Sequence, residues 1–104
     1  MENKKVKNRN VHVAKNDNEW RRLVLEKYTT CAWPGCSNYA SDAHHIVRRD
    51  SLELRQVVEN GIGLCRKHHL AVESLPRKTY WKVISFIISE EITKFLQELN
   101  PFEV

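Results

Sequence analysis

The stretch NGIGLCRKHH, residues 60–69, decides the fold of this chain. Residues 62–64 are apolar and predict a short strand, and Cys65 opens a helix that is expected to reach residue 73. Before this stretch, residues 38–47 are short of helix caps and end in an extended run, which predicts a partner strand. The order strand, loop, strand, helix indicates an α+β fold in which a hairpin is closed by a helix.

Histidines and cysteines occur in pairs from residue 31 onward. The pairs are Cys31-x4-Cys36, His44-His45, and Cys65-x2-His68, which is followed at once by His69. Structural zinc sites use four sulfur and nitrogen ligands in a tetrahedron, and ligands in closely spaced pairs are typical of them. Cys31, Cys36, Cys65 and His68 therefore predict a closed zinc site, for which His69 is the alternative fourth ligand. The competing interpretation is three free cysteines that serve as small core residues.

The histidines that are not needed for zinc suggest a second metal site. His44 and His45 are adjacent on the predicted strand, so their side chains point to opposite faces. His69 and Glu73 are four residues apart on the predicted helix and share a face, as two ligands of one ion would. We therefore expect His44 and His69 to bind a divalent ion while His45 acts beside it. Asn60 either fixes the loop by hydrogen bonds or ligates the ion directly.

This pattern suits the hydrolysis of a phosphodiester. A divalent ion binds the scissile phosphate and stabilises both the developing charge and the leaving 3′ oxygen. A neutral histidine, with a pKa of about 6.5, takes a proton from the attacking water at neutral pH. Such a site needs incomplete protein ligation, because the phosphate and the water fill the remaining positions.

Three separated motifs in this order resemble an HNH endonuclease, from the zinc-knuckle branch of the ββα-metal (His-Me finger) nucleases. The motifs are DAHHIV at 42–47, NGIGLC at 60–65 and HH at 68–69. The resemblance implies a ββα-metal hairpin-and-helix core over residues 31–73. A structural Zn²⁺ would staple this core, and an N-terminal helix and one or more C-terminal helices would flank it. It also implies a catalytic divalent ion, which is Mg²⁺, Mn²⁺ or Ni²⁺.

The resemblance assigns catalytic roles by position. His45 matches the general base, His44 the first-strand metal ligand, Asn60 the central Asn of the family name, and His69 the final metal-binding histidine. The chain departs from the pattern at His68, where many relatives have a fourth zinc cysteine. Zinc tolerates that exchange.

Two acidic residues near the motifs have alternative interpretations. Glu73 stands where some relatives have another histidine, and it is either a carboxylate ligand or an exposed helix residue. Asp42 lies two residues before His44 on the same strand face. It either orients a metal-binding histidine by a hydrogen bond or is a solvated surface residue.

A basic surface is expected beside the site. The net charge of +4 and the pI near 9.1 favour a polyanionic partner. The cations closest in sequence to the site are Arg48, Arg49, Arg55, Arg66 and Lys67. Phosphate contacts position a duplex without reading its sequence, so the expected function is a DNA endonuclease with little sequence specificity. The alternative is a non-catalytic zinc module that binds nucleic acid or a partner protein.

The length of 104 residues predicts a single domain over residues 17–104, preceded by a flexible basic arm at 1–16. The cations of the arm are Lys4, Lys5, Lys7, Arg9 and Lys15. Asp17 or Asn18 is expected to cap a helix over residues 19–28.

The section 76–99 has apolar residues at helical spacing and predicts a helical C-terminal part of the domain. Ser89 is also able to cap a second helix, which would split this section near Ile88.

Cysteine use and hydropathy bear on the compartment. Three cysteines cannot all pair within one molecule, which indicates a reducing compartment. No run of about 18 apolar residues occurs, and the lysine-rich start lacks the apolar segment of a signal peptide. The expected location is the cytoplasm, that of the host cell if a phage encodes the chain.

As a small single-domain HNH protein, this chain resembles those that tailed phages encode near their DNA-packaging genes. The resemblance implies a DNA-packaging accessory with terminase or portal proteins as partners.

Overall fold

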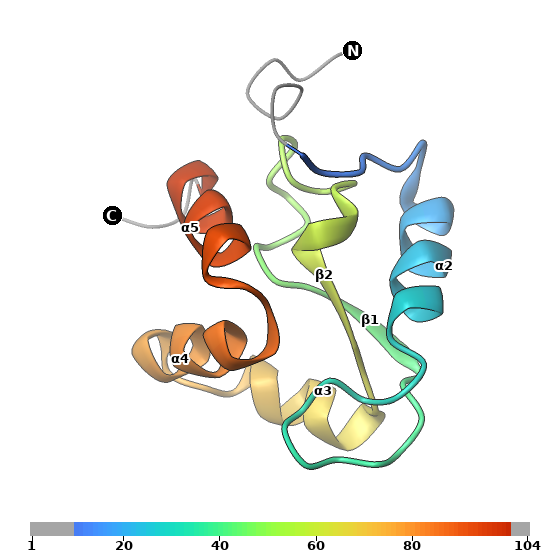
Figure 1. Cartoon of the computed structure of the whole chain (residues 1–104), viewed down its shortest axis with the longest axis vertical. Coiled ribbons are helices and arrows are strands. Elements are labelled where there is room, and N and C mark those ends of the chain that lie inside the picture. The colour runs from blue at the N-terminus through green and yellow to red at the C-terminus, as the bar shows by residue number, and fades with distance from the viewer. Residues whose placement is uncertain (1–9, 101–104) are drawn as a thin grey trace.

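Two short antiparallel strands, β1 (Asp42–His45) and β2 (Gly61–Leu64), form a hairpin at the centre of the chain (Figure 1). The computed structural model describes residues 10–100. A 3-10 turn, η1 (Val58–Asn60), leads into β2, and the helix α3 (Arg66–Glu73) follows β2 after a single residue. The predicted order of strand, loop, strand and helix is therefore present, and the α+β class is confirmed.

Four helices surround this hairpin in the part of the chain that the structure describes. They are α2 (Asp17–Lys27), α3, α4 (Arg77–Ile87) and α5 (Glu90–Leu99). Figure 1 shows α2 on one side of the hairpin and the pair α4 and α5 on the other, with α3 at the end where β2 finishes. The hairpin therefore lies between an N-terminal and a C-terminal helical layer.

The first helix begins two residues earlier than the sequence predicted. Asn16 is its N-cap, in place of Asp17 or Asn18, and the side-chain oxygen of Asn16 accepts a hydrogen bond of 2.8 Å from the backbone N–H of Glu19. An Asn at this position satisfies one of the unpaired N–H groups of the first helical turn. This cap leaves the Asp17 side chain available for a different partner.

The helix α2 lies directly against the backbone of β2. A Cβ atom at Gly61 would stand 2.4 Å from Val24 Cγ2 and 2.7 Å from Trp20 Cζ2, and a Cβ at Gly63 would stand 2.6 Å from Tyr28 Cβ. The glycines of the GIGL strand are therefore required by close approach. Trp20 is buried, and its indole N–H donates to the backbone carbonyl of Val57 over 2.8 Å.

The segment before α2 is joined to the loop that precedes β2. Val13 forms an antiparallel bridge with Val57, and the N–H of Ala14 donates to the carbonyl of Gln56 over 2.8 Å. The predicted flexible arm therefore extends less far than residue 16. Residues 1–9, which hold most of its cations, lie outside the described residues.

The C-terminal section forms two helices, as the alternative interpretation allowed. The Ser89 hydroxyl oxygen accepts a hydrogen bond of 3.1 Å from the N–H of Ile92 and so caps α5, directly after Ile88, the C-cap of α4. The main core joins these helices to the hairpin and α3, and includes Ile62, Leu64, Val72, Ile84, Phe95 and Leu96. No helix within residues 10–100 has the length and apolar character needed to cross a membrane.

Candidate metal centres and active site

Three cysteines and one histidine converge at the end of the hairpin. Cys31 and Cys36 lie in the loop after α2, which turns at Gly35 with a positive φ of 83°. Cys65 is the N-cap of α3, and His68 lies in the first turn of that helix. The four potential ligand atoms are all within 4.8 Å of one another. The structure therefore brings together the four residues that the sequence predicted as one cluster.

The spacing of this cluster fits a tetrahedral zinc ion. His68 Nδ1 lies 3.5 Å from Cys31 Sγ and 3.4 Å from Cys65 Sγ. Sulfur at about 2.3 Å and nitrogen at about 2.05 Å from a tetrahedral zinc ion are separated by about 3.6 Å. Trp33 stacks on the His68 ring at 4.7 Å between centroids, which fixes the ring plane. The cluster is therefore able to hold a metal ion such as zinc.

The thiols of the cluster differ in proton affinity. The backbone N–H of His68 lowers the pKa of Cys65, because it stabilises the thiolate. Burial raises the pKa of Cys31, because desolvation disfavours the charged form. The Asn38 side-chain amide also donates toward Cys65 Sγ, over 3.9 Å. Of these two cysteines, Cys65 has the surroundings that favour the thiolate a metal ion requires.

A second group of potential ligands lies between β1 and α3. His44, His69 and Glu73 each offer one ligand atom, and these atoms are within 4.8 Å of one another. His69 Nε2 lies 3.7 Å from Glu73 Oε2, and the rings of His44 and His69 meet edge to face at 5.2 Å between centroids. The structure therefore brings together the two predicted histidine ligands. The same group includes Glu73, which the sequence allowed to be either a ligand or an exposed surface residue.

Asp42 holds the ring of His69. His69 Nδ1 is 2.8 Å from Asp42 Oδ2, and Arg66 Nε is 3.3 Å from the same oxygen. Burial by itself would raise the pKa of Asp42, but the hydrogen bonds from His69 and Ser41, together with the Arg66 charge, lower it below its usual value. An ionised carboxylate only accepts, so neutral His69 carries its proton on Nδ1 and a lone pair on Nε2. Asp42 thus occupies the orienting position that was one of its two interpretations.

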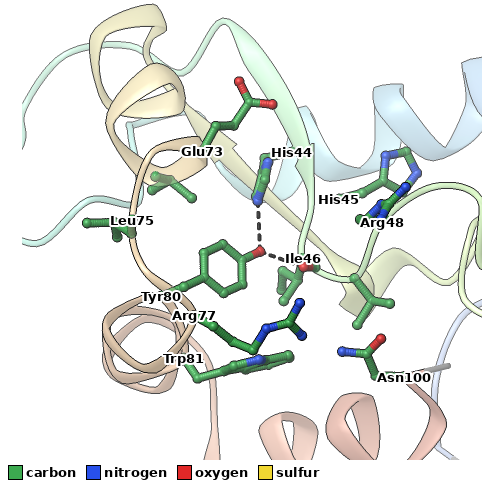
Figure 2. A pocket seen from close by; sticks show the side chains of 12 residues that line it. His44, His45, Ile46, Arg48, Glu73, Leu75, Arg77, Tyr80, Trp81 and Asn100 are labelled. Carbon is green, nitrogen blue, oxygen red and sulfur yellow. Dashed lines mark hydrogen bonds between the residues drawn. The ribbon is translucent and has the colours of Figure 1, made fainter. Parts of the chain in front are cut away.

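His44 is the most deeply buried of these histidines. Burial lowers its pKa to about 3, and the neighbouring His69 and His45 act in the same direction, so His44 is neutral at physiological pH. Its Nε2 lies 2.9 Å from the hydroxyl of Tyr80 in α4 (Figure 2). Tyr80 could not be predicted as a site residue, because its place in an amphipathic helix carries no signal of a polar contact 36 residues away.

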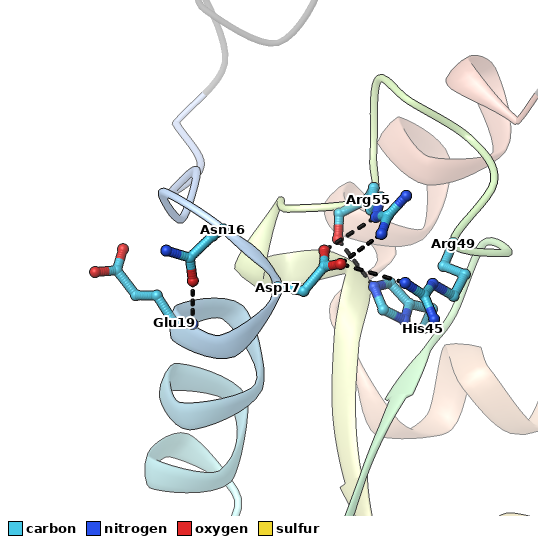
Figure 3. A network of polar contacts seen from close by, with 6 residues as sticks. All are labelled: Asn16, Asp17, Glu19, His45, Arg49 and Arg55. Carbon is cyan, nitrogen blue, oxygen red and sulfur yellow. Dashed lines mark hydrogen bonds and ion pairs between the residues drawn. The ribbon is translucent and has the colours of Figure 1, made fainter.

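His45 points to the opposite face of β1 and has different partners. Its ring stacks on Trp20 at 3.6 Å between centroids, with 6° between the planes. Its Nε2 lies 2.9 Å from the backbone carbonyl of Arg55, as Figure 3 shows. A carbonyl only accepts, so neutral His45 carries its proton on Nε2 and keeps a lone pair on Nδ1. Burial lowers the pKa of His45, which favours this neutral form.

Asn60 fixes a loop and does not face either cluster. It is fully buried, its oxygen accepts from the Val47 N–H over 2.7 Å, and its NH₂ group donates to the carbonyls of Val47 and Leu54, each over 3.1 Å. All these bonds hold the chain that leaves β1. Of the two roles considered for Asn60, these bonds match the fixing of the loop. Its place among the candidate catalytic residues changes to that of a positioning residue.

The predicted basic residues divide into two groups. The Arg55 guanidinium is two-thirds buried and binds both carboxylate oxygens of Asp17, with 3.0 Å from Nε to Oδ1. The ion pair therefore holds the loop whose carbonyl contacts His45, and the assignment of Arg55 to the DNA-binding surface stays a prediction. The remaining cations expose their side chains to solvent and are Arg48, Arg49, Arg66 and Lys67. Arg49 also reaches Asp17, at 3.2 Å.

Two adjoining cavities meet over the paired histidines. One, of about 490 Å³, extends past Tyr80 and Trp81 of α4 (Figure 2). The other, of about 670 Å³, extends past Trp20 of α2 and is lined by His69 and Arg49. Both are lined by His44, His45, Arg48 and Glu73. An extended ligand crossing these cavities would pass over both histidines.

Comparison of the chain with family models, with curated proteins and with solved structures gives no match. The assignment of function therefore rests on the residues and geometry of the site.

Proposed function

We propose that the chain is a metal-dependent DNA endonuclease of the HNH, or ββα-metal, type. One observation carries this proposal: adjacent histidines on β1 have separate surroundings that suit separate tasks. His44 belongs to a set of three potential ligands with His69 and Glu73. His45 has none of these partners, and is held instead by Trp20 and the Arg55 carbonyl. An open metal site with a nearby base suits metal-assisted hydrolysis of a phosphodiester.

In this proposal His45 is the general base. The Arg55 carbonyl keeps the ring proton on Nε2, so the Nδ1 lone pair is the one that accepts a proton from the attacking water. Stacking on Trp20 restricts the ring to one plane, so the base is already oriented before the reaction. Burial keeps His45 neutral at physiological pH. The residue is thus in the protonation state and orientation that a base requires.

His44, His69 and Glu73 would hold the divalent ion, which is Mg²⁺, Mn²⁺ or Ni²⁺. When bound, such an ion stabilises negative charge on the scissile phosphate and on the leaving oxygen. Three protein ligands leave coordination positions for the phosphate and for water. Asp42 keeps His69 in the tautomer whose Nε2 lone pair faces Glu73. The two imidazoles suit Ni²⁺, and the carboxylate suits Mg²⁺ and Mn²⁺.

The proposed zinc site gives the hairpin its rigidity. Cys31 and Cys36 come from the loop after α2, whereas Cys65 and His68 begin α3, so one ion would tie these segments together. Because His69 follows His68 directly, the same ion would also fix the start of the helix that carries the second site. We therefore assign zinc a structural role.

DNA would be held by its phosphates. Arg48 and Arg49 line the cavities over the histidines, and the exposed Arg66 and Lys67 lie in the first turn of α3. Phosphate contacts of this kind bind duplexes of any sequence, and they weaken steeply with salt. The expected substrate is therefore DNA without a strong sequence preference.

The deciding experiment is cleavage of supercoiled plasmid by the zinc-loaded wild type and by His45→Ala, each with Mg²⁺, Mn²⁺, Ni²⁺ or EDTA. We expect metal-dependent nicking or linearisation by the wild type and a loss of at least 100-fold in the variant, since a general base contributes roughly 10²–10⁴-fold. Folded wild type that leaves every form of the plasmid intact with all three ions would contradict the proposal.

One observation favours a second candidate, a non-catalytic zinc module that binds nucleic acid. The thiolate cluster and the exposed cations do not depend on His45 for their geometry. Such a module would retain salt-sensitive DNA binding, would cleave nothing, and would take up one metal ion per chain. A metal titration that shows a second ion distinguishes the nuclease from this module.

A further inference from the structure

A continuous chain of polar contacts connects His44 to α4. His44 Nε2 lies 2.9 Å from the Tyr80 hydroxyl oxygen, and this hydroxyl donates a hydrogen bond to the backbone carbonyl of Ile46. Figure 2 shows the hydroxyl between its two partners. The Tyr80 ring also meets the His44 ring edge to face, at 6.0 Å between centroids. Tyr80 is mostly buried, so water does not compete freely for these contacts.

The direction of these hydrogen bonds follows from the number of protons available. A carbonyl oxygen only accepts, and a phenol has one proton, so the Tyr80 proton is used on Ile46. The contact between Tyr80 and His44 therefore requires His44 Nε2 to be the donor. In neutral His44 the remaining nitrogen, Nδ1, then carries the lone pair.

We propose that Tyr80 is a positioning residue that fixes His44 as the Nε2–H tautomer and so presents the Nδ1 lone pair to a divalent cation. The inference rests on the proposed metal site of His44, His69 and Glu73, but not on DNA cleavage. It assigns a role to α4, which lies outside the hairpin and the helix that carry the ligands themselves.

The two histidines of the site would then be prepared in the same way. Asp42 accepts a hydrogen bond from the Nδ1–H of His69, which leaves its Nε2 free. Tyr80 accepts one from the Nε2–H of His44, which leaves its Nδ1 free. In each case the proton is directed into the protein and the lone pair is left for the metal ion. Partners of this kind change metal affinity by roughly 10–100-fold when they are removed.

The test uses zinc-loaded full-length protein as wild type, as Tyr80→Phe, and as Tyr28→Phe. Tyr28 is also partly buried but belongs to the opposite side of the hairpin, so it is a matched control for loss of a phenol hydroxyl. Long-range ¹H–¹⁵N spectra of the imidazole rings report which nitrogen of His44 is protonated, before any second metal is added. The His44 signal is assigned by its absence in His44→Gln. Titration with Mn²⁺ alone then measures the affinity of the second site.

We expect wild type and Tyr28→Phe to show protonated Nε2 and unprotonated Nδ1 at His44. Tyr80→Phe should show a mixture of the two tautomers and a roughly 10-fold weaker Mn²⁺ affinity. A wild type with its proton on Nδ1 would overturn the inference even if Tyr80→Phe failed to fold. So would a folded Tyr80→Phe with an unchanged tautomer and unchanged Mn²⁺ affinity. An absence of DNA cleavage would remove the nuclease proposal without altering either readout.

Discussion

The imidazole of His45 lies parallel to the indole of Trp20, with 3.6 Å between the ring centroids and 6° between the ring planes. Trp20 belongs to α2, and the partner of His45 Nε2 is the carbonyl of Arg55 in the loop before β2. The proposed base is therefore oriented by two segments that are separate from its own strand. Its ionisation and its geometry both depend on them.

Cleavage should remain active at mildly acidic pH. Burial lowers the pKa of His45 below its ordinary 6.5, the Arg55 carbonyl opposes this, and the Arg49 charge adds to the lowering. The base is active when neutral, so the rate should rise with pH through a midpoint below 6.5 and then level off. Arg49→Ala should move this midpoint to higher pH, because a cation facing His45 is lost. The measurement is kcat against pH with Mn²⁺ saturating throughout, and a midpoint above 6.5 in the wild type would contradict the assignment.

Loss of one zinc ligand should unfold the domain. Cys31→Ser or Cys65→Ser removes a thiolate from a cluster that joins the loop after α2 to α3. Domains of this size have a free energy of unfolding of about 5–15 kcal/mol, which the loss of a structural zinc ion can exhaust. We expect no bound zinc and no cooperative thermal transition in either variant. Ala32→Ser adds a hydroxyl to the same loop and should keep both, whereas a zinc-free variant that melts like the wild type would contradict the structural role.

Much of the fold could be predicted because its signals are local. The pairs Cys31 with Cys36 and Cys65 with His68 are each close in sequence, so one turn presents both members. The helical spacing of apolar residues in 76–99 and the Ser89 cap likewise depend on neighbours within four residues. Such patterns can be recognised without knowing the tertiary structure.

The parts that could not be predicted depend on contacts between distant residues. Tyr80 meets His44 across 36 residues, and Arg55 binds Asp17 across 38 residues. Sequence spacing placed Arg55 beside the site, but only the fold shows that a carboxylate already binds it. The predicted cap of α2 was wrong for another reason. The consecutive Asn and Asp residues at 16–18 are all able to cap a helix, and packing of the helix decides among them.

Replacement of Asn60 should destabilise the protein without affecting the metal site directly. Asn60→Ala removes three buried hydrogen bonds to Val47 and Leu54 and leaves their backbone groups unpaired. The expected loss is about 3 kcal/mol in the free energy of unfolding, measured with urea. Mn²⁺ affinity, measured where the variant is still folded, should stay within a few-fold of wild type. A loss of 100-fold or more under those conditions would show that Asn60 is a ligand after all.

Two basic residues, one in α3 and one in the loop before β2, should affect different steps. Lys67 is exposed in the first turn of α3, so Lys67→Ala should weaken DNA binding and reduce the slope of log affinity against log salt concentration by about 1. Its effect should fall on KM, because a phosphate contact binds the ground state and the transition state equally.

Arg55→Ala should instead lower kcat, because the loop whose carbonyl orients His45 loses its ion pair with Asp17. Single-turnover cleavage and fluorescence anisotropy with a labelled duplex separate the two effects. If Arg55→Ala weakened DNA binding and left kcat unchanged, Arg55 would be a phosphate contact and its role in orienting His45 would have to be abandoned.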